Sequence, residues 1–427
     1  MHILLMTYGT RGDIQPFIAL AYGLQQTGHM VTLAAPGRFQ SLVQQHGLAF
    51  APLTDALINL TSKPQFANAS NPGTGFLKKI SSILKLRAQG RDLQGALLDD
   101  IFETINRIRP DKIVFHPKAF GALAIADHFA IPAILAQLIP ALIPTRAYPH
   151  IGFPNMADCQ KYNLLTGKLV KGLVNLSLRN SLRDWASKRH KVIPYQKFDI
   201  LKSQKFGAIT VLNAYSNAII ARPNDWPKKA AVTGYWFVND ALYEPSTEMT
   251  SFIKNSQKLI YIGFGSMPAT NPQKTAQMLI DAVKQANVQA IIATGWGGIA
   301  SDVDWPSNIY AVREVPHEWM FKHVKTAIHH GGAGTCAAAL RAGCPSIIVP
   351  FFGDQPFWAK RLYTIGVAHQ LIPSSKLDAK CLASAISDIL ATPQVHETAK
   401  RIAKQISHEN GVATAVDLIL NGTEIAA

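Results

Sequence analysis

Residues 326–361, TAIHHGGAGTCAAALRAGCPSIIVPFFGDQPFWAKR, hold the pattern that decides the fold of this 427-residue chain. An apolar strand end leads into two histidines and a glycine-rich turn, and the alanine-rich residues 335–341 predict a helix. Gly343 and Pro345 end that helix, and the apolar residues 346–352 predict a second buried strand. A strand–turn–helix–strand unit of this kind is typical of a parallel α/β sheet.

The glycine turn, residues 331–334, predicts an anion site. Backbone N–H groups and the positive end of a helix meet there, and glycines let a diphosphate approach the backbone closely. Asp354 and Gln355 follow the second strand and would offer acceptors and donors to sugar hydroxyls. The turn has neither the Gly-Lys-Ser/Thr of a Walker A loop nor GxGxxG spacing. The alternative is that it is only a tight connection.

The composition suits a globular α/β protein of two or three domains, with 48% hydrophobic and 16% charged residues. Four scattered cysteines without CxxC spacing indicate a reducing, cytoplasmic compartment and no zinc site. The amino terminus lacks the basic segment of a signal peptide. The longest apolar run, residues 131–144, is too short for a membrane span.

Positive charge is concentrated in the first half of the chain. Residues 1–213 hold 24 Lys and Arg against 11 Asp and Glu, whereas residues 214–427 hold 18 against 16. No basic-aromatic module of a known type appears, so nucleic acid is not expected as a partner. Residues 163–191 carry leucines at helical spacing among Lys and Arg, which predicts one or two basic amphipathic helices. Such a helix either packs on the domain with a solvated basic side or makes peripheral contact with an anionic membrane.

The chain also begins with a β-turn-α-β unit. Residues 2–7 predict a buried strand, residues 14–24 a helix and residues 30–35 the next strand. No acidic residue closes that second strand, which argues against NAD binding in this half. Asp13 stands in the first turn, where one interpretation is that it caps the helix.

The glycine turn and this first turn carry a resemblance to a known family. HHGGAGT, RAGCP and PFFGDQPFW, together with GTRGDIQPFIAL at residues 9–20, resemble inverting glycosyltransferases that use UDP-sugars. They are most similar to the sterol 3-β-glucosyltransferase branch, and the segment ARPNDWPKKAAVTGYWF at residues 221–237 extends the similarity over nearly the whole chain.

The resemblance implies an α/β protein of the GT-B fold, with two Rossmann-like doubly wound domains facing a cleft. The expected division is an acceptor-binding domain over 1–213, a linker over 214–257, a UDP-sugar-binding domain over 258–405, and a C-terminal helix over 406–427 that returns toward the first domain. The implied activity is transfer of a hexose, with UDP-glucose as the leading donor, to a hydroxyl of a lipophilic acceptor such as a sterol. The UDP-sugar is a co-substrate, and neither a metal nor another cofactor is expected.

Two other functions remain open on the sequence. A nucleotide-sugar epimerase of the same fold would need no acceptor site. A non-catalytic lipid- or nucleotide-binding protein would share the fold without the reaction.

The resemblance also assigns roles to individual residues. Asp13 matches the catalytic base, and His116, after the strand predicted at 111–115, would partner it; the alternative for His116 is a locally bonded, partly buried histidine. The expected donor-binding residues are Gly265, Ser266, Trp296, Val315, His317, His330, Gly332, Gly334, Thr335, Asp354 and Gln355. The expected acceptor-binding residues are Ile143, Arg146, Tyr148 and His150.

The chain departs from its relatives at two of these places. Ile143-Pro144 stands where the sterol branch has Met-Pro-Trp, which leaves the acceptor open. Ala338 stands where plant-type relatives have a ribose-binding glutamate, so the ribose contact is unassigned.

Overall fold

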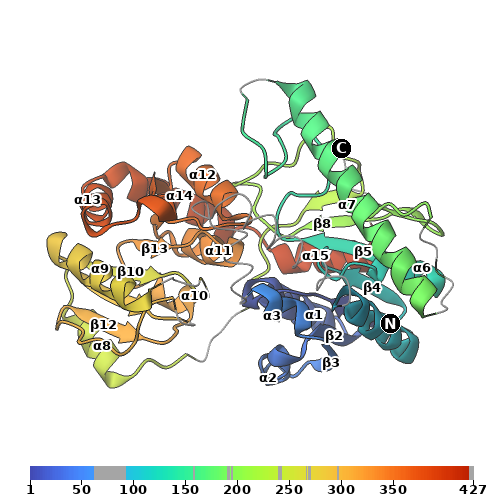
Figure 1. Cartoon of the computed structure of the whole chain (residues 1–427), viewed down its shortest axis with the longest axis horizontal. Coiled ribbons are helices and arrows are strands. Elements are labelled where there is room, and N and C mark those ends of the chain that lie inside the picture. Colours follow the sequence, from blue (N-terminus) through green and yellow to red (C-terminus); the bar gives the residue numbers. More distant parts are fainter. Residues whose placement is uncertain are drawn as a thin grey trace. The chain divides into compact units, whose positions relative to one another are not determined.

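The structure, a computed structural model, describes residues 1–61, 93–156, 159–189, 193, 196–238, 243–265, 267, 271–295 and 298–422. The chain forms two compact units (Figure 1). Unit 1 comprises Met1–Val238 together with Asn410–Ala427, and unit 2 is the continuous segment Asn239–Glu409 between them. The passage expected as a linker, 214–257, is therefore divided between the two units.

Unit 1 is built on a seven-stranded sheet in which every neighbouring pair is parallel. Its strands are β1 (His2–Met6), β2 (Met30–Pro36), β3 (Ala49–Leu53), β4 (Lys112–Phe115), β5 (Ala133–Gln137), β8 (Val211–Asn213) and β9 (Ala230–Val232). Their spatial order is β3-β2-β1-β4-β5-β8-β9. The central strands are continuous apolar runs because helices cover both faces of such a sheet. A short antiparallel pair, β6 (Lys202–Ser203) and β7 (Gly207–Ala208), stands apart.

The helical elements of unit 1 are α1 (Arg11–Gln26), η1 (Gly37–Phe39), α2 (Gln40–Gln45), α3 (Ala56–Thr61), a helix over residues 93–108, α6 (Ala122–His128), α7 (Gln160–Lys188) and α15 (Gly411–Asn421). Helix α15 packs on α1, where Gly23 leaves no room for a side chain: a Cβ there would lie 2.4 Å from Val412 Cγ1. Ala415, Val416 and Ile419 of α15 join the core of the first sheet. The end of the chain therefore completes unit 1.

Unit 2 repeats the plan with a six-stranded parallel sheet. Its strands are β10 (Leu259–Gly263), β11 (Gln289–Ala293), β12 (Ile309–Val312), β13 (Ala327–His329), β14 (Ser346–Ile348) and β15 (Ala368–Leu371). Their order is β12-β11-β10-β13-β14-β15. The helical elements are α8 (Thr247–Lys254), α9 (Pro272–Gln285), α10 (His317–Met320), α11 (Ala333–Ala342), α12 (Gln355–Thr364), η2 (Ser374–Lys376), α13 (Ala379–Leu390) and α14 (Pro393–Ser407).

Both sheets reverse their strand order at the first strand. In unit 1 the reversal lies between β1 and β4, and in unit 2 between β10 and β13. Ligands of doubly wound proteins bind at the carboxyl ends of the strands at such a switch point. The predicted pair of doubly wound domains is thus confirmed, and the topology marks one candidate site in each unit. Within the described residues, no helix combines the length and the hydropathy that crossing a bilayer would require.

Candidate active site

Asp13 lies at the switch point of unit 1, in the first turn of α1. Its oxygen Oδ2 accepts hydrogen bonds from the backbone N–H of Thr10 at 2.8 Å and from the Thr10 hydroxyl at 3.2 Å. Gly9 makes room for this carboxylate, because a Cβ at Gly9 would lie 2.2 Å from Oδ2 and its φ of 137° is a conformation that side chains disfavour. Asp13 therefore caps its helix through Oδ2, and the oxygen Oδ1 takes no part in that cap.

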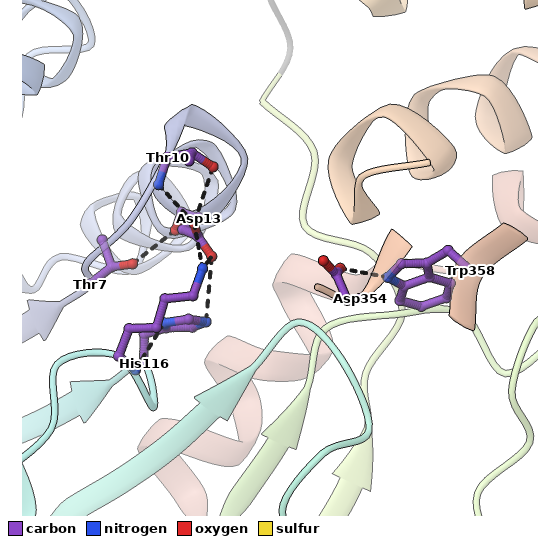
Figure 2. A network of polar contacts seen from close by, with 7 residues as sticks. Thr7, Thr10, Asp13, His116, Asp354 and Trp358 are labelled. Carbon is purple, nitrogen blue, oxygen red and sulfur yellow. Dashed lines mark hydrogen bonds and ion pairs between the residues drawn. The ribbon is translucent and has the colours of Figure 1, made fainter. Parts of the chain in front are cut away.

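His116 and Lys118 follow β4, the strand beside β1, and both approach Asp13. Lys118 Nζ donates to Asp13 Oδ1 at 2.7 Å and to Oδ2 at 2.9 Å. His116 Nε2 lies 3.8 Å from Oδ1, on the side of Asp13 opposite Thr10 (Figure 2). The Asp13 side chain is 12% exposed and that of Lys118 is 55% exposed. The carboxylate is thus enclosed by its neighbours, with a partly exposed ammonium group as one of them.

The protonation states in this cluster follow from burial and charge. Burial lowers the pKa of His116 to about 4, so the ring is neutral near pH 7. Its Nδ1 accepts the backbone N–H of Lys118 at 3.3 Å, which leaves the ring proton on Nε2, the nitrogen facing Asp13. Burial alone would raise the pKa of Asp13, but the Lys118 ammonium and the hydrogen bonds outweigh it, so that pKa lies below its ordinary value. Asp13 is therefore a carboxylate at neutral pH.

Lys118 is the residue of this cluster to which the sequence assigned no role. A single lysine beyond a strand end is typical of ordinary surface charge. The one signal that could have found it is its position, two residues after His116, in the turn that follows the strand adjacent to β1.

In unit 2, Gly265 and His330 follow the two strands at the switch point. The His330 ring lies between two glycines: a Cβ on Gly265 would be 3.2 Å from its Cε1, and a Cβ on Gly332 would be 2.5 Å from its Nε2. His330 Nδ1 is buried and has no hydrogen-bond partner in the described part of the chain. Burial lowers the pKa of His330 to about 4, so the ring is neutral near pH 7. A buried, unsatisfied ring nitrogen suits a ligand that brings its own polar atoms.

Helix α11 begins at Ala333, three residues after His330. Gly332 is its N-cap, and Gly334 and Thr335 lie in its first turn, where backbone N–H groups lack acceptors within the helix. These groups and the helix dipole favour an anion at this end. His329, by contrast, is occupied: its Nδ1 accepts the N–H of Gly331 at 3.1 Å, and its Nε2 contacts Ser346 Oγ at 3.1 Å. Of the two histidines, His330 is thus the one available to a ligand.

Asp354 and Gln355 stand at the start of α12 and are held by protein contacts. The buried Gln355 uses Oε1 to accept the backbone N–H groups of Phe351 at 2.7 Å and Phe352 at 3.2 Å. Asp354 Oδ2 accepts Trp358 Nε1–H at 3.0 Å (Figure 2). The Gln355 amide thus shapes the turn between β14 and α12, and the expected contacts of both residues with sugar hydroxyls stay predictions.

The remaining donor-binding predictions fall in three places. Val315 is buried just ahead of α10. His317 Nε2 lies 3.1 Å from Tyr261 Oη, and its ring stacks on Phe321 at a centroid distance of 4.9 Å, so it is packed into unit 2. Ser266 and Trp296 lie outside the described residues.

The predicted acceptor-binding residues belong to one loop of unit 1. Ile143 is buried, Tyr148 and His150 are partly buried, and Arg146 is exposed. The Arg146 backbone N–H donates to Asp225 Oδ2 at 2.7 Å, and the His150 backbone N–H donates to Thr166 Oγ1 of α7 at 3.0 Å. The loop is therefore tied down at both ends, in unit 1 throughout.

Comparison with known proteins identifies the class. The glycosyltransferase family 28 N-terminal domain matches residues 3–148, and the C-terminal domain of erythromycin biosynthesis protein CIII-like proteins matches residues 277–416. Among solved structures, the glycotransferase of kitacinnamycin covers 99% of both chains with a TM-score of 0.71 at 17% identity. The calicheamicin glycosyltransferase CalG4 covers 100% of this chain and 99% of its own, with a TM-score of 0.68 at 18% identity.

With two doubly wound units and these neighbours, the molecule is a glycosyltransferase of the GT-B fold. It is 33% identical to the sterol 3-beta-glucosyltransferase UGT80B1 of Arabidopsis thaliana over 98% of this chain and 67% of that protein. It is 34% identical to the sterol 3-beta-glucosyltransferase of Saccharomyces cerevisiae (strain YJM789) over 99% of this chain and 35% of that protein. The chain belongs to the sterol 3-beta-glucosyltransferase family, which confirms the predicted family, fold class and enzyme class. It spans two thirds or less of the length of these relatives.

Proposed function

We propose that this enzyme transfers glucose from UDP-glucose to the hydroxyl of a sterol or a similar lipophilic alcohol, with inversion at the anomeric carbon. The relatives bear the name sterol 3-beta-glucosyltransferase, which supports both the sugar and the acceptor class. The observation that carries the proposal is the Asp13 carboxylate at the switch point of unit 1, enclosed and kept ionised by Lys118.

Asp13 is the general base in this reaction. It takes the proton of the acceptor hydroxyl, whose oxygen attacks the anomeric carbon from the face opposite UDP. The bond from that carbon to the diphosphate breaks, and UDP leaves with its electron pair, so an α-linked donor yields a β-linked product. Backbone N–H groups at the start of α11 and the His330 ring stabilise the charge on the leaving diphosphate. The proposal requires no metal ion and no cofactor besides the co-substrate.

The neighbours of Asp13 have supporting roles. His116 is neutral, and its Nε2–H faces Oδ1 across 3.8 Å, a distance too long for a hydrogen bond, so it flanks the carboxylate and does not take the proton. Lys118 keeps the carboxylate ionised, and its partly exposed side chain occupies the approach to Oδ1 before an acceptor arrives. The acceptor is expected to reach unit 1 from an anionic membrane surface with which the enzyme makes peripheral contact.

Replacing Asp13 with Asn tests the assignment, because the change preserves shape and removes the proton acceptor. We expect kcat with UDP-glucose and a sterol to fall by about 10²–10⁴-fold. UDP affinity, measured by calorimetry, should be unchanged, since the donor residues lie in the other unit.

Asp127→Asn is the matched control, because Asp127 is a buried carboxylate of the same unit that accepts from the Gln204 backbone N–H at 2.8 Å, outside the candidate site. It should reduce stability more than turnover. Near-normal turnover in Asp13→Asn would remove Asp13 from the mechanism.

A further inference from the structure

Helix α7, the long helix of unit 1 in Figure 1, carries a row of leucines that are exposed to solvent. Leu165, Leu169, Leu173 and Leu176 are 65%, 50%, 56% and 45% exposed, and they are four of the ten large apolar side chains that are exposed among the described residues. With about 3.6 residues per turn, the four fall within an arc of roughly 80°. A contiguous apolar face of this kind on a helix marks an interaction surface more often than chance exposure.

The opposite side of α7 explains why the helix is held in place without using these leucines. Leu182 and Trp185 are buried, and Trp185 Nε1 donates to Asp99 Oδ1 at 2.8 Å near the C-terminal end. Asn163 and Thr166 are buried near the N-terminal end. The helix is thus anchored at both ends, and its fold does not depend on covering the leucine row.

Positive charge borders the leucine row. Helix α7 contains six Lys and Arg against one acidic residue, Asp184. Lys161, Lys168 and Arg179 lie within roughly 60° of the edge of the leucine arc. Within the described part of the chain, these three form no ion pair, whereas Lys171 is engaged by Asp199 at 2.7 Å. An apolar stripe with a basic border is the pattern of helices that lie in a membrane interface.

We propose that α7 docks unit 1 onto an anionic bilayer, with the leucine row among the acyl chains and the basic border among the headgroups. Two partners could cover the leucine row, a second copy of this chain or an anionic bilayer. Pairing two copies of this face would bring like charges together, whereas an anionic surface complements them, so the positive charge favours the bilayer. Helix α7 lies on the surface and does not span it, in keeping with its hydropathy.

The same helix carries the loop expected to bind the acceptor. Asn163 Nδ2 donates to the Arg146 carbonyl at 3.0 Å, and Thr166 Oγ1 accepts the His150 N–H at 3.0 Å. Gly167 lets Pro144 pack against the helix, because a Cβ there would lie 2.9 Å from Pro144 Cα. Docking through α7 therefore holds this loop at the bilayer. That consequence rests on the proposed function, whereas the docking itself does not.

Vesicle binding tests the docking. We expect wild-type enzyme to co-sediment with phosphatidylcholine vesicles that contain phosphatidylserine, and much less with phosphatidylcholine alone. The triple variant Leu165→Gln, Leu169→Gln, Leu173→Gln should lower the partition coefficient by about 1,000-fold, since each buried leucine contributes roughly tenfold. Lys168→Glu with Arg179→Glu should lower it by at least about 25-fold. Tyr22→Gln with Tyr363→Gln, which changes exposed apolar residues elsewhere, should bind like wild type.

Activity is measured separately, on sterol embedded in the same vesicles and on sterol in detergent. The leucine variant should lose the first activity and keep the second. Wild type that does not sediment with anionic vesicles, or leucine variants that sediment like wild type, would refute the docking. A leucine variant that instead changes the oligomeric state would identify the row as a self-association surface. Vesicle binding without any sterol glucosylation would refute the proposed function and leave the docking standing.

Discussion

Asp13 uses its two carboxylate oxygens for different purposes. Oδ2 accepts from the backbone and hydroxyl of Thr10 and is committed to the start of α1. Oδ1 meets Lys118 at 2.7 Å and faces His116 at 3.8 Å. Of the two oxygens, Oδ1 is therefore the one that can take a proton without unravelling the helix start. The lysine must yield its place when the acceptor hydroxyl approaches, which its long, partly exposed side chain permits.

Lys118→Met should shift the pH dependence of the reaction. Burial raises the pKa of Asp13, and the Lys118 ammonium is the largest of the influences that lower it, so removing the ammonium should raise that pKa. The acid limb of kcat/KM should move to higher pH, by about 1–3 units. Lys118→Arg retains the positive charge, so its acid limb should lie at the same pH as that of the wild-type enzyme. The measurement is a pH–rate profile at saturating UDP-glucose, and an unmoved limb in Lys118→Met would show that the lysine does not set the ionisation of the base.

Part of this cluster follows from the sequence and part does not. Asp13 and His116 come after two apolar runs, and runs that become neighbouring parallel strands bring their carboxyl ends to one edge, so their proximity was predictable. Lys118 and Gln355 are different, because their contacts depend on how a turn folds back. The Gln355 amide bonds its own turn, and no spacing pattern distinguishes that from binding a sugar.

At the scale of elements, a single glycine allows α15 to pack closely against α1. Gly23 faces Val412, and a Cβ at Gly23 would lie 2.4 Å from Val412 Cγ1. A β-branched side chain has little freedom to move away. Contact between the two helices thus depends on the absence of a side chain at this position.

Gly23→Ala should consequently destabilise unit 1, by about 1–3 kcal/mol for overpacking, despite the better helix propensity of Ala. In a Val412→Ala background the same substitution should cost much less, because the nearest methyl group is gone and only Val416 Cγ2, at 3.2 Å, still has to yield. Urea denaturation of the four proteins of this double-mutant cycle measures both effects. Equal effects in the two backgrounds would mean that the helices adjust freely.

The elements themselves were largely foreseeable. Strand β2 (Met30–Pro36) begins at the predicted residue and ends one residue beyond the predicted end. Helix α1 starts at Arg11, three residues before the predicted start at Ile14. The reason is a capping box, in which the Asp13 carboxylate, in the first turn, accepts the backbone N–H of the N-cap residue Thr10. Pro16 consequently lies inside the helix. Side-chain capping of this kind does not alter apolar periodicity, so the pattern could not reveal it.

At the scale of the whole molecule, buried neutral histidines predict sensitivity to acid. Burial lowers the pKa of His116 and His330 from 6.5 to about 4 and lowers that of His329 well below its ordinary value. Between pH 6.5 and 4 the unfolded chain binds these protons and the folded chain does not. The free energy of unfolding should therefore fall as the pH falls through this window, by about 3 kcal/mol for each of His116 and His330, and should have no slope from these rings above it.

Urea titrations at several pH values measure this slope. His330→Gln should reduce the slope for unit 2, because Gln carries no titrating ring and His329 is left to contribute its part. His408→Gln, at an exposed position of the same unit, should leave it unchanged. A slope that survives His330→Gln in full would assign the acid sensitivity to other groups.

Domain limits were harder to foresee than elements. Strand β9 (Ala230–Val232) extends the sheet of unit 1 into a proline-rich passage that resembles a linker in sequence. Three residues are too few for a periodicity signal. Unit 1 consequently runs to Val238, and sequence pattern alone did not place that limit.

Unit 2 is an insertion between residues 238 and 410 of unit 1, and this has a consequence for biosynthesis. A ribosome releases all of unit 2 before it releases α15, so the second unit has its complete sequence while the first still lacks the helix that covers α1. The amino-terminal unit, although made first, is the last to finish folding. A premature stop codon or a protease cut before residue 411 would for the same reason injure the half of the enzyme that carries Asp13, at the far end of the chain.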